Sequence, residues 1–286
     1  MDILHKRKYW YIISLIFITV GFIFLIINGL NFGIDFQGGT ILEFSFEEEV
    51  NNDQIREVLN EINIAENSQI RQSDTQDLNG VIIRAQELNT EEIDKIETAV
   101  TDSFSNAEML RTDMVGPTIG QELRLQALWA LLIASLAIVA YISIRFEFRF
   151  AIVAIITLLH DVAITIGVFA ILQREINTAF IAALLTIIGY SINDTIVIFD
   201  RIRENMKIMR RTSFIEKANT AVVDTLPRSV NTSITTLVTI LAIYLFGGAS
   251  LKVFMLALFI GMFAGTYSSI FVASPLLVTW QNKIST

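Results

Sequence analysis

Six long apolar stretches divide the chain, and polar segments of different lengths separate them. A helix needs roughly 20 mostly apolar residues to cross a bilayer, and each stretch is close to or above that length. The stretches are Trp10–Ile27, Leu125–Ile144, Ala151–Leu172, Ala179–Phe199, Ser229–Phe246 and Leu251–Val278. The first is too long for a signal peptide, and no small-residue cleavage site follows it. The pattern therefore predicts six membrane-spanning helices, with the first as an uncleaved anchor.

The polar segment between the first two stretches has the periodicity of a folded domain. Alternating apolar residues indicate strands, and apolar residues at helical spacing indicate amphipathic helices. Strands are predicted at Ile41–Phe46, Gln69–Gln72, Val81–Ala85 and Glu108–Val115, helices at Asn51–Ile62 and Thr90–Phe104, and a turn at Asp77–Gly80. Asn51 and Gln54 suit a capping box. The order βαββαβ predicts a small ferredoxin-like α+β domain.

These patterns divide the chain into three parts. Residues 1–29 hold the N-terminus and the first helix, residues 30–121 the α+β domain, and residues 122–286 the second to sixth helices with the C-terminus. The predicted fold class is thus a polytopic membrane protein whose six-helix half-bundle, of transporter type, carries an α+β domain between its first two helices.

Composition narrows the functional classes. Of the 286 residues, 53% are hydrophobic and 17% are charged, which is too apolar for an ordinary soluble domain. There is no cysteine and there are two histidines, both outside residues 30–121. Thiolate chemistry is therefore excluded, and a Ser-His-Asp triad in the α+β domain is excluded as well. We predict a protein that is not an enzyme and has no cofactor.

The distribution of charge predicts the orientation in the membrane. Basic residues precede the first helix at Lys6–Lys8 and fill the segment from Arg201 to Arg228, whereas residues 30–121 hold most of the carboxylates behind the net charge of −8. Loops rich in Lys and Arg stay in the cytoplasm. Both termini are therefore predicted to be cytoplasmic and the α+β domain extracytoplasmic, with its scattered carboxylates as a solvated surface rather than a cation site.

Polar residues inside the apolar stretches carry the functional hypothesis. Asp194 lies in the fourth stretch, and placing Asp at the centre of a bilayer costs about 2.5–3.5 kcal/mol on insertion scales. Two membrane carboxylates with a facing arginine are the usual parts of a proton relay. We assign to such a relay Asp194, Arg228, Asp161, Thr232 and Asn193.

Simpler interpretations of these residues stay open. Asp194 and Arg228 could form a structural salt bridge. The hydroxyl stripe that follows Arg228 at helical spacing, made of Thr232, Thr235, Thr236 and Thr239, could then serve only for packing against another helix. Arg228 could also be a positive-inside residue just outside its span. His160 could relay protons or could be a neutral, hydrogen-bonded histidine.

Glycine-containing stretches flank the α+β domain. Gly33, Gly38 and Gly39 follow the first helix, and Gly116 and Gly120 precede the second. Glycine permits positive φ and close backbone approach, so these stretches are either plain turns or a pair of hinges.

Two further patterns concern packing. Ser213–Leu226 is amphipathic and suits either a helix on the cytoplasmic membrane surface or a plain connector. Gly261 and Gly265 form a Gly-x-x-x-Gly pattern, which we assign to packing within the half-bundle rather than to a contact with another subunit.

At this level the chain resembles the SecD/SecF family of the bacterial Sec protein-export system, in particular the smaller of its paired subunits. The match covers essentially the whole chain. The motifs that carry it are Gly33–Thr40, Val115–Leu123, His160–Asp161, Tyr190–Asn205 and Arg228–Thr236. Of these, the fourth-helix motif is highly specific, and the first glycine motif is less so because the larger subunits have a similar one.

The resemblance implies half of a resistance-nodulation-division type transporter, whose other six helices come from SecD. It implies an accessory subunit of the Sec translocase that couples proton or sodium flow to late steps of polypeptide export, with the family's membrane Asp and Arg at Asp194 and Arg228. The implied location is the bacterial inner (cytoplasmic) membrane. The implied partners are SecD, the SecYEG translocon, YajC, YidC, the translocating polypeptide and the lipid bilayer, with no nucleic acid.

Two other functional classes stay open. One is an ion-driven exporter of small molecules or lipids of the same superfamily, and the other is a membrane scaffold without transport. A single six-helix half argues against a self-sufficient exporter.

Overall fold

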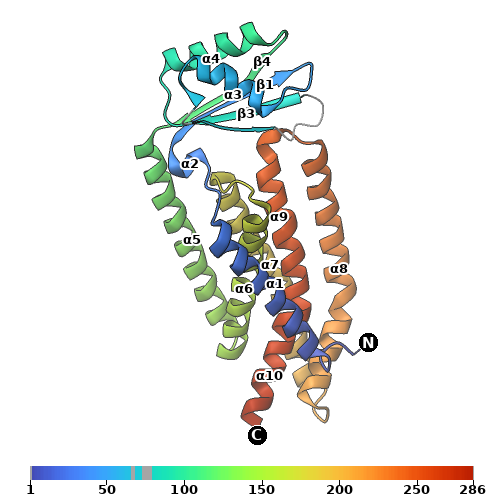
Figure 1. Cartoon of the computed structure of the whole chain (residues 1–286). Helices are drawn as coiled ribbons and strands as arrows, with labels where there is room; N and C mark the ends of the chain where they lie inside the picture. The colour runs from blue at the N-terminus through green and yellow to red at the C-terminus, as the bar shows by residue number, and fades with distance from the viewer. Residues whose placement is uncertain (1, 66–67, 73–78, 286) are drawn as a thin grey trace. The chain divides into compact units, whose positions relative to one another are not determined.

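The computed structural model describes residues 2–65, 68–72 and 79–285 (Figure 1). Part of the predicted turn at Asp77–Gly80 lies outside these residues. The elements form two compact units, an α+β unit of Phe32–Leu128 and a helical unit of Met1–Asn31 with Trp129–Thr286.

The α+β unit is built on one antiparallel sheet with the strand order β2-β3-β1-β4. The strands are β1 (Gly39–Phe46), β2 (Ser68–Gln72), β3 (Asn79–Ala85) and β4 (Glu108–Val115), and the helices between them are α3 (Asn52–Glu61) and α4 (Thr90–Ser103). Both helices cover the same face of the sheet (Figure 1). The predicted βαββαβ order is thereby confirmed. The short helix α2 (Ile34–Gln37) was not predicted.

Apolar residues from the sheet and from both helices close the core of this unit. Leu42 and Phe44 of β1 are fully buried against Ile55 of α3 and Ile96 of α4. Asn51 caps α3 in a capping box with Gln54, as predicted. The alternation along β1 and the helical spacing in α3 and α4 therefore place one apolar face of each element toward the others.

The helical unit contains the membrane-spanning segments. Its elements are α1 (Arg7–Asn28), most of α5 (Pro117–Arg145), α6 (Phe148–Leu172), α7 (Thr178–Ile208), α8 (Phe214–Phe246), α9 (Ala249–Ser268), the π-helical turn η2 (Ser269–Ala273) and α10 (Ser274–Ser285). Among the described residues, six helices are long and apolar enough to cross a membrane, as predicted. Both termini lie at the same end of this unit (Figure 1).

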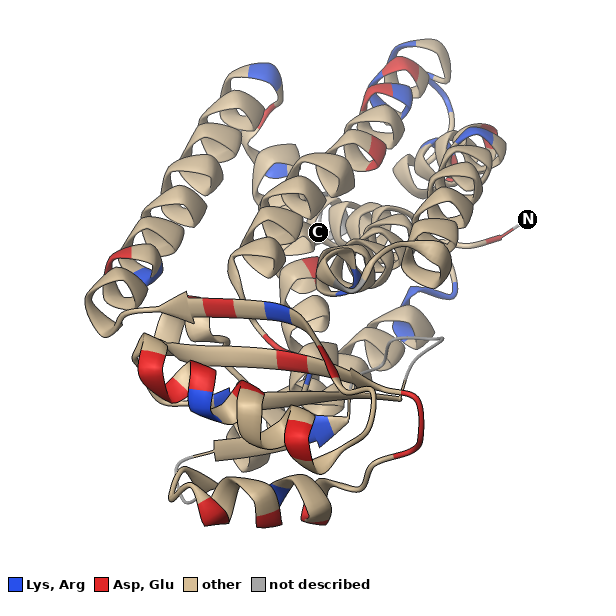
Figure 2. Ribbon diagram, turned by 90° about the horizontal axis from the view of Figure 1, so that it is seen from above, with Lys and Arg blue, Asp and Glu red and all other residues tan. Residues whose placement is uncertain are grey.

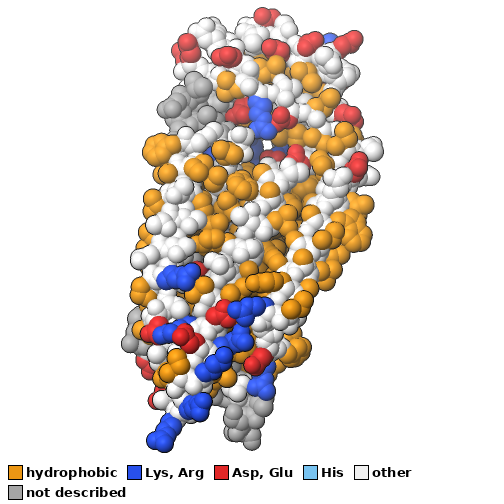
Figure 3. All heavy atoms as spheres, turned by 180° about the vertical axis from the view of Figure 1, so that it is seen from behind, with side chains coloured by type: hydrophobic (Ala, Val, Ile, Leu, Met, Phe, Trp, Pro, Cys, Tyr) orange, Lys and Arg blue, Asp and Glu red, His pale blue; other side chains and the backbone are white. Residues whose placement is uncertain are grey.

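Charged residues of the helical unit lie mainly near the ends of its helices. Along the long helices, Figure 2 shows the Lys, Arg, Asp and Glu residues mostly near the ends, with uncharged residues between them. Figure 3 shows most of the basic side chains of the helical unit toward the end at which α7 and α8 are joined, a connection that carries Arg210 and Arg211. One end of the unit is therefore basic, which is the pattern behind the predicted orientation.

The segment Ser213–Leu226 is not a separate surface helix. It forms the first turns of α8, which continues without a break through Pro227 to Phe246. Ala218, Ala221 and Val222 are completely buried in the core of the helical unit. The interpretation as a helix lying on the membrane surface is therefore wrong, because its apolar side packs against other helices instead of lipid.

Small residues set the closest helix contacts. Gly21 of α1 and Gly167 of α6 meet so closely that a Cβ added to Gly21 would lie 2.8 Å from the Cα of Gly167. Gly261 of α9 faces Ile187, and Gly265 faces Ser191, both on α7. This confirms that the Gly-x-x-x-Gly pattern packs within the half-bundle, where small residues let helices approach.

Candidate functional site

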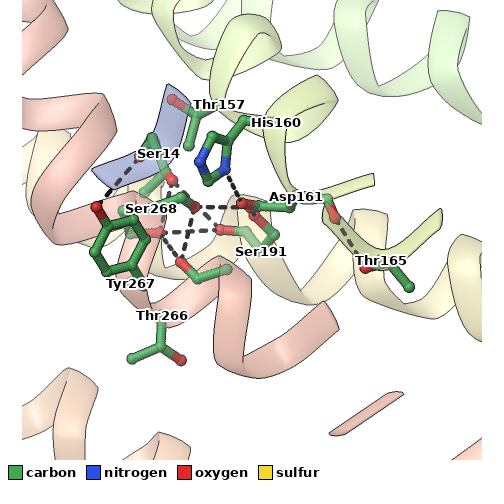
Figure 4. A network of polar contacts seen from close by, with 12 residues as sticks. Ser14, Thr157, His160, Asp161, Thr165, Ser191, Thr266, Tyr267 and Ser268 are labelled. Carbon is green, nitrogen blue, oxygen red and sulfur yellow. Dashed lines mark hydrogen bonds and ion pairs between the residues drawn. The ribbon is translucent and has the colours of Figure 1, made fainter. Parts of the chain in front are cut away.

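Asp161 is the centre of a buried polar network that joins three helices (Figure 4). It lies on α6 and is completely buried. Its Oδ2 atom accepts hydrogen bonds from Ser191 Oγ of α7 at 2.5 Å and from Ser268 Oγ of α9 at 2.8 Å. The Nδ1 atom of His160 lies 2.8 Å from Oδ1. Both carboxylate oxygens are thus occupied, as a buried carboxylate requires.

The π-helical turn η2 extends this network along α7. Ser269, its first residue, lies with its hydroxyl 2.9 Å from that of Thr195 on α7. Ser274 Oγ donates to the carbonyl of Ser269, five residues earlier. A π-helical turn is wider than an α-helical one and often occurs at functional sites. At the junction of α9 and this turn, the consecutive serines Ser268 and Ser269 reach α6 and α7 respectively.

His160 lies between this network and α1. Its ring stacks on that of Tyr267, with the ring centroids 6.2 Å apart. The Tyr267 hydroxyl donates to the carbonyl of Trp10 and lies 3.2 Å from Ser14 Oγ. The Nε2 atom of His160 is buried and has no partner among the described residues. The network therefore reaches from α7 and α9 through α6 to the first helix.

Asp194 lies outside this network, on the part of α7 that packs against α8. It is 5% exposed, and its Oδ2 atom is buried without a hydrogen-bond partner among the described residues. Arg228 of α8 acts on Asp194 electrostatically. No ion pair within 4.0 Å joins the two in the part of the chain that the structure describes. The salt-bridge interpretation is therefore not supported by the geometry of this unit.

The other predicted relay residues lie on the surface of the helical unit. Asn193, Arg228 and Thr232 are exposed. Along α8, Thr235 and Thr239 donate their hydroxyl groups to backbone carbonyls of the preceding turn. The hydroxyl stripe is thus not packed against another helix of this unit. The structure brings Asp194 to the edge of an exposed polar face and keeps Asp161 behind it, inside the bundle.

The two glycine stretches lie against each other within the α+β unit. Gly38 and Gly39 have positive φ values of 77° and 125°, a region that other residues rarely adopt. A Cβ on Gly38 would lie 3.1 Å from the Cα of Pro117, and one on Gly120 would lie 3.1 Å from the nitrogen of Gly38.

The remaining glycines are less constrained. Gly33 precedes α2 in an extended conformation, and a Cβ on Gly116 would meet a side-chain oxygen of Glu87 at 3.5 Å. Arg124 Nη2 donates to the carbonyl of Phe36 at 2.5 Å and fixes the two stretches further. The hinge assignment stays a prediction. The close contacts at Gly38 and Gly120 show that the two stretches pack against each other rather than forming two separate turns.

Within residues 2–65, 68–72 and 79–285 there is no group of three or more His, Cys, Asp or Glu side chains that could hold a metal ion.

Comparison with known proteins assigns the family. The family model described as "Protein export membrane protein SecD/SecF, C-terminal" matches residues 95–283, and the model "SecD/SecF GG Motif" matches residues 23–50. The chain belongs to the SecD/SecF family. The second match includes the glycines at positions 33, 38 and 39.

Curated relatives in this family are called "Protein translocase subunit SecF". The relative from Thermobaculum terrenum is 44% identical, over 99% of this chain and 95% of its own length. The relative from Haemophilus influenzae is 39% identical, over 95% of this chain and 83% of its own length. The chain therefore falls within the SecF branch of the SecD/SecF family.

Two solved SecDF structures have the same fold. SecDF from Thermus thermophilus, described as a translocon-associated membrane protein, is 37% identical with a TM-score of 0.91, over 99% of this chain. SecDF in a "super-membrane-facing form" is 37% identical with a TM-score of 0.73, over the whole chain. In both cases this chain spans 39% of the length of the SecDF chain.

Several polar residues near the site were missed or underrated in the sequence. Ser268 and Ser269 follow the Gly-x-x-x-Gly pattern, which suggested packing only, yet they contact Asp161 and Thr195. Ser229 is buried beside Arg228 and was not singled out. The available signal was a hydroxyl residue recurring in otherwise apolar helices, which in membranes often marks an interhelical hydrogen bond.

Proposed function

We propose that this chain is the SecF-type half of an ion-coupled machine that assists late steps of protein export together with SecD. The observation that carries the proposal is Asp194. It is a carboxylate buried in a membrane helix, and one of its oxygens has no partner among the described residues. An ionisable side chain of this kind usually marks an ion pathway.

The exposed polar face beside Asp194 supports a second half. Asn193, Arg228 and Thr232 are polar and exposed on helices that otherwise face apolar surroundings. Polar groups in a bilayer need partners, because the hydrocarbon offers none. The solved SecDF relatives contain further chain beyond the part matched here. SecD is accordingly the partner that we propose for this face.

The two carboxylates have different roles in this proposal. Asp194 carries the coupling ion, which we take to be a proton, with sodium as the alternative. Asp161 has three hydrogen-bond partners already, so it can join a proton relay only by exchanging one of them. Its bond to Ser191, one turn before Asp194, holds α7 in register with α6. In this proposal Asp161 is the more deeply buried proton-binding residue of the relay, and it also holds α6 and α7 together.

Magnitudes limit what one ion can do. A proton that crosses about 100 mV supplies about 2.3 kcal/mol. Inverting a conformational equilibrium from 1:99 to 99:1 needs about 5.5 kcal/mol. One proton per cycle therefore gives a partial population shift, and a complete switch needs more than one. A further carboxylate from SecD would meet this requirement.

The location follows from the same proposal. The basic end of the helical unit, which includes both termini, faces the cytoplasm according to the positive-inside rule. The α+β unit then lies on the outer side of the bacterial inner membrane, where it can meet a polypeptide that emerges from the translocon.

The test replaces Asp194 by Asn and measures secretion of a reporter protein in cells, with and without collapse of the proton gradient. We expect Asp194→Asn to reduce secretion to the level seen after the gradient is collapsed, because the amide cannot take up a proton. Asp200→Asn is the matched control on the same helix. Asp200 pairs with Arg145 and Arg203 and is not part of the proposed relay.

Unchanged gradient-dependent secretion in cells that carry Asp194→Asn at normal protein levels would show that the relay assignment is wrong. Loss of secretion in both variants would point to a general defect in the helix. Co-purification with SecD is measured for each variant, because a failure to assemble would reduce secretion without any change in ion coupling.

A further inference from the structure

Three buried oxygens on α7 and α8 have no hydrogen-bond partner among the described residues. They are the hydroxyl of Tyr190, Oδ2 of Asp194 and Oγ of Ser229. Buried polar groups in proteins are nearly always paired, so each exception requires an explanation. Tyr190 lies one helical turn before Asp194, on the same face of α7.

The contacts between α7 and α8 fix the register of this antiparallel pair. Asn205 Nδ2 donates to the carbonyl of Lys217, and Arg201 donates through Nε and Nη2 to Oδ2 of Asp224. Each step back along α7 is thus matched by a step forward along α8. Two turns before Arg201, Asp194 lies opposite the turn of α8 that contains Ser229.

Two independent observations agree with this register. Arg228, the neighbour of Ser229, is the residue whose charge acts on Asp194. Ser229 is 2% exposed and belongs to the buried face of α8, whereas Arg228 is exposed. The serine therefore faces into the unit at the level of the carboxylate, and the arginine lies at the margin of the same contact.

Ser229 differs from the other hydroxyl residues on its face of α8. Thr225, one turn earlier, donates to the carbonyl of Ala221. Ser233, one turn later, lies with its hydroxyl 2.7 Å from that of Thr266 on α9. Serine inside a helix commonly bonds the carbonyl four residues earlier, but Ser229 makes no such bond among the described residues. Its hydroxyl is thus available to a group on α7.

We propose that Ser229 is a positioning residue for Asp194, whose Oδ2 atom it holds through one bridging water molecule, since the two oxygens make no direct hydrogen bond with each other. The proposal rests on the proposed function of Asp194 as the carboxylate that takes up the coupling proton. A hydroxyl group both donates and accepts. Through the water it donates to the charged carboxylate, and after Oδ2 takes up a proton the carboxyl O–H donates to the water, which donates in turn to Ser229 Oγ.

This arrangement keeps Asp194 in place during the whole cycle. The charge of Arg228 attracts only the ionised carboxylate, so this attraction is lost when Asp194 binds a proton. Ser229 stays bonded in both states. The proton comes from one side of the membrane and leaves to the other, and no covalent bond other than that O–H bond is made or broken.

Infrared difference spectroscopy tests the contact without transport. The chain is reconstituted in lipid with its SecD-type partner, and spectra are recorded on changing pH. The C=O stretching band of protonated Asp194 is identified by its loss in Asp194→Asn. We expect Ser229→Ala to shift this band to higher frequency, because the carboxyl group loses a hydrogen bond, and Ser229→Thr to restore it.

Ser233→Ala is the matched control, since it removes a buried hydroxyl one turn away that already has a partner. An unshifted band in Ser229→Ala overturns the proposal. A shift in Tyr190→Phe with none in Ser229→Ala also overturns it and assigns the contact to Tyr190. A shift of equal size in Ser233→Ala would show a general change in packing and would likewise count against Ser229.

Secretion provides the second measurement. Gradient-dependent secretion is expected to fall about tenfold in Ser229→Ala, the effect of one hydrogen bond to a charged group, and to recover in Ser229→Thr. The two hypotheses fail separately. If Asp194→Asn leaves secretion unchanged, the proposed function is wrong, whereas the infrared band still reports whether Ser229 contacts Asp194.

Discussion

The interiors of the two units differ in kind. In the α+β unit the buried cluster is apolar, with Leu42, Phe44 and Ile55 among its least exposed members. Among the described residues of this unit only one polar side chain is completely buried, that of Thr40, which accepts a hydrogen bond from the backbone N–H of Leu88. The helical unit also has an apolar cluster, but its completely buried residues include Asp161, Ser268 and Ser269. In addition, many of its largest apolar side chains are exposed, such as Phe263 on α9.

The difference reflects the solvent that each unit meets. In water, burial of apolar surface drives folding, so apolar side chains go inside. In lipid, the surroundings are as apolar as leucine, and helices associate through close packing and hydrogen bonds. Small and hydroxyl residues therefore occupy the helix contacts, and apolar residues face outward. A large apolar residue thus indicates the core in the α+β unit and the lipid-facing surface in the helical unit.

The largest expected difference in stability is between removing a buried phenylalanine ring from the α+β unit and removing an exposed one from the helical unit. Phe44→Ala should lower the free energy of unfolding of the α+β unit by about 3–5 kcal/mol, because it removes a buried ring and leaves a cavity. Phe263→Ala should change the stability of the helical unit by less than about 0.5 kcal/mol. Hydrogen exchange of β1 and of α9 measures both. Equal effects would show that the units do not differ as described.

The next effect concerns the glycine contact between α1 and α6. Gly21→Ala places a methyl group against the backbone of Gly167 and should destabilise the helical unit by about 1–3 kcal/mol, the usual range for overpacking. Gly189→Ala is the matched control, because no atom lies within 4 Å of its added Cβ.

Thermal unfolding of this pair is followed by the fluorescence of Trp10, whose ring packs 4.2 Å from that of Phe271. The other tryptophans are replaced by Phe, so the signal comes from α1. If Gly21→Ala unfolds at the same temperature as Gly189→Ala, close backbone approach is not what holds α1.

The smallest effect concerns the caps of the α+β unit. The side chain of Asn89 accepts a hydrogen bond from the backbone N–H of Glu92 at 2.9 Å and begins α4. Asn89→Ala should cost about 1 kcal/mol, and Asn89→Asp should cost almost nothing, since aspartate caps equally well. Hydrogen exchange in the first turn of α4 measures this. Equal protection in both variants would contradict the role of the cap.

The same comparison explains what could be predicted from the sequence. In the α+β unit, strand β4 was predicted with its observed bounds, and α3 and α4 end within a residue of their predicted ends. Water on one side and a core on the other impose a regular alternation that the sequence displays. α2 was missed because four residues are too few to show a period.

In the helical unit, hydropathy predicted the six spans but not which face of each helix is buried. Asp194 and Asp161 were recognised as buried carboxylates from their apolar surroundings. Their partners were not, since the pairing of Asp161 with Ser191 and Ser268 depends on how three helices cross. Ser229 and Ser233 have the same sequence character, and only packing separates the one with a partner from the one without.

The π-helical turn at Ser269–Ala273 has a consequence for changes in chain length. It spans one residue more per turn than an α-helix, so it is equivalent to a one-residue insertion. Deleting one residue there would let the segment close as ordinary α-helix, with the buried Leu277 and Val278 still facing the core, but it would remove the wide turn that brings Ser269 to Thr195. Deleting a residue in the regular part of α9 would instead rotate everything after it by about 100°. Related chains that lack this turn should thus be one residue shorter at this segment, whereas the length of the regular helix on either side should be fixed, because it sets which side of α10 faces inward.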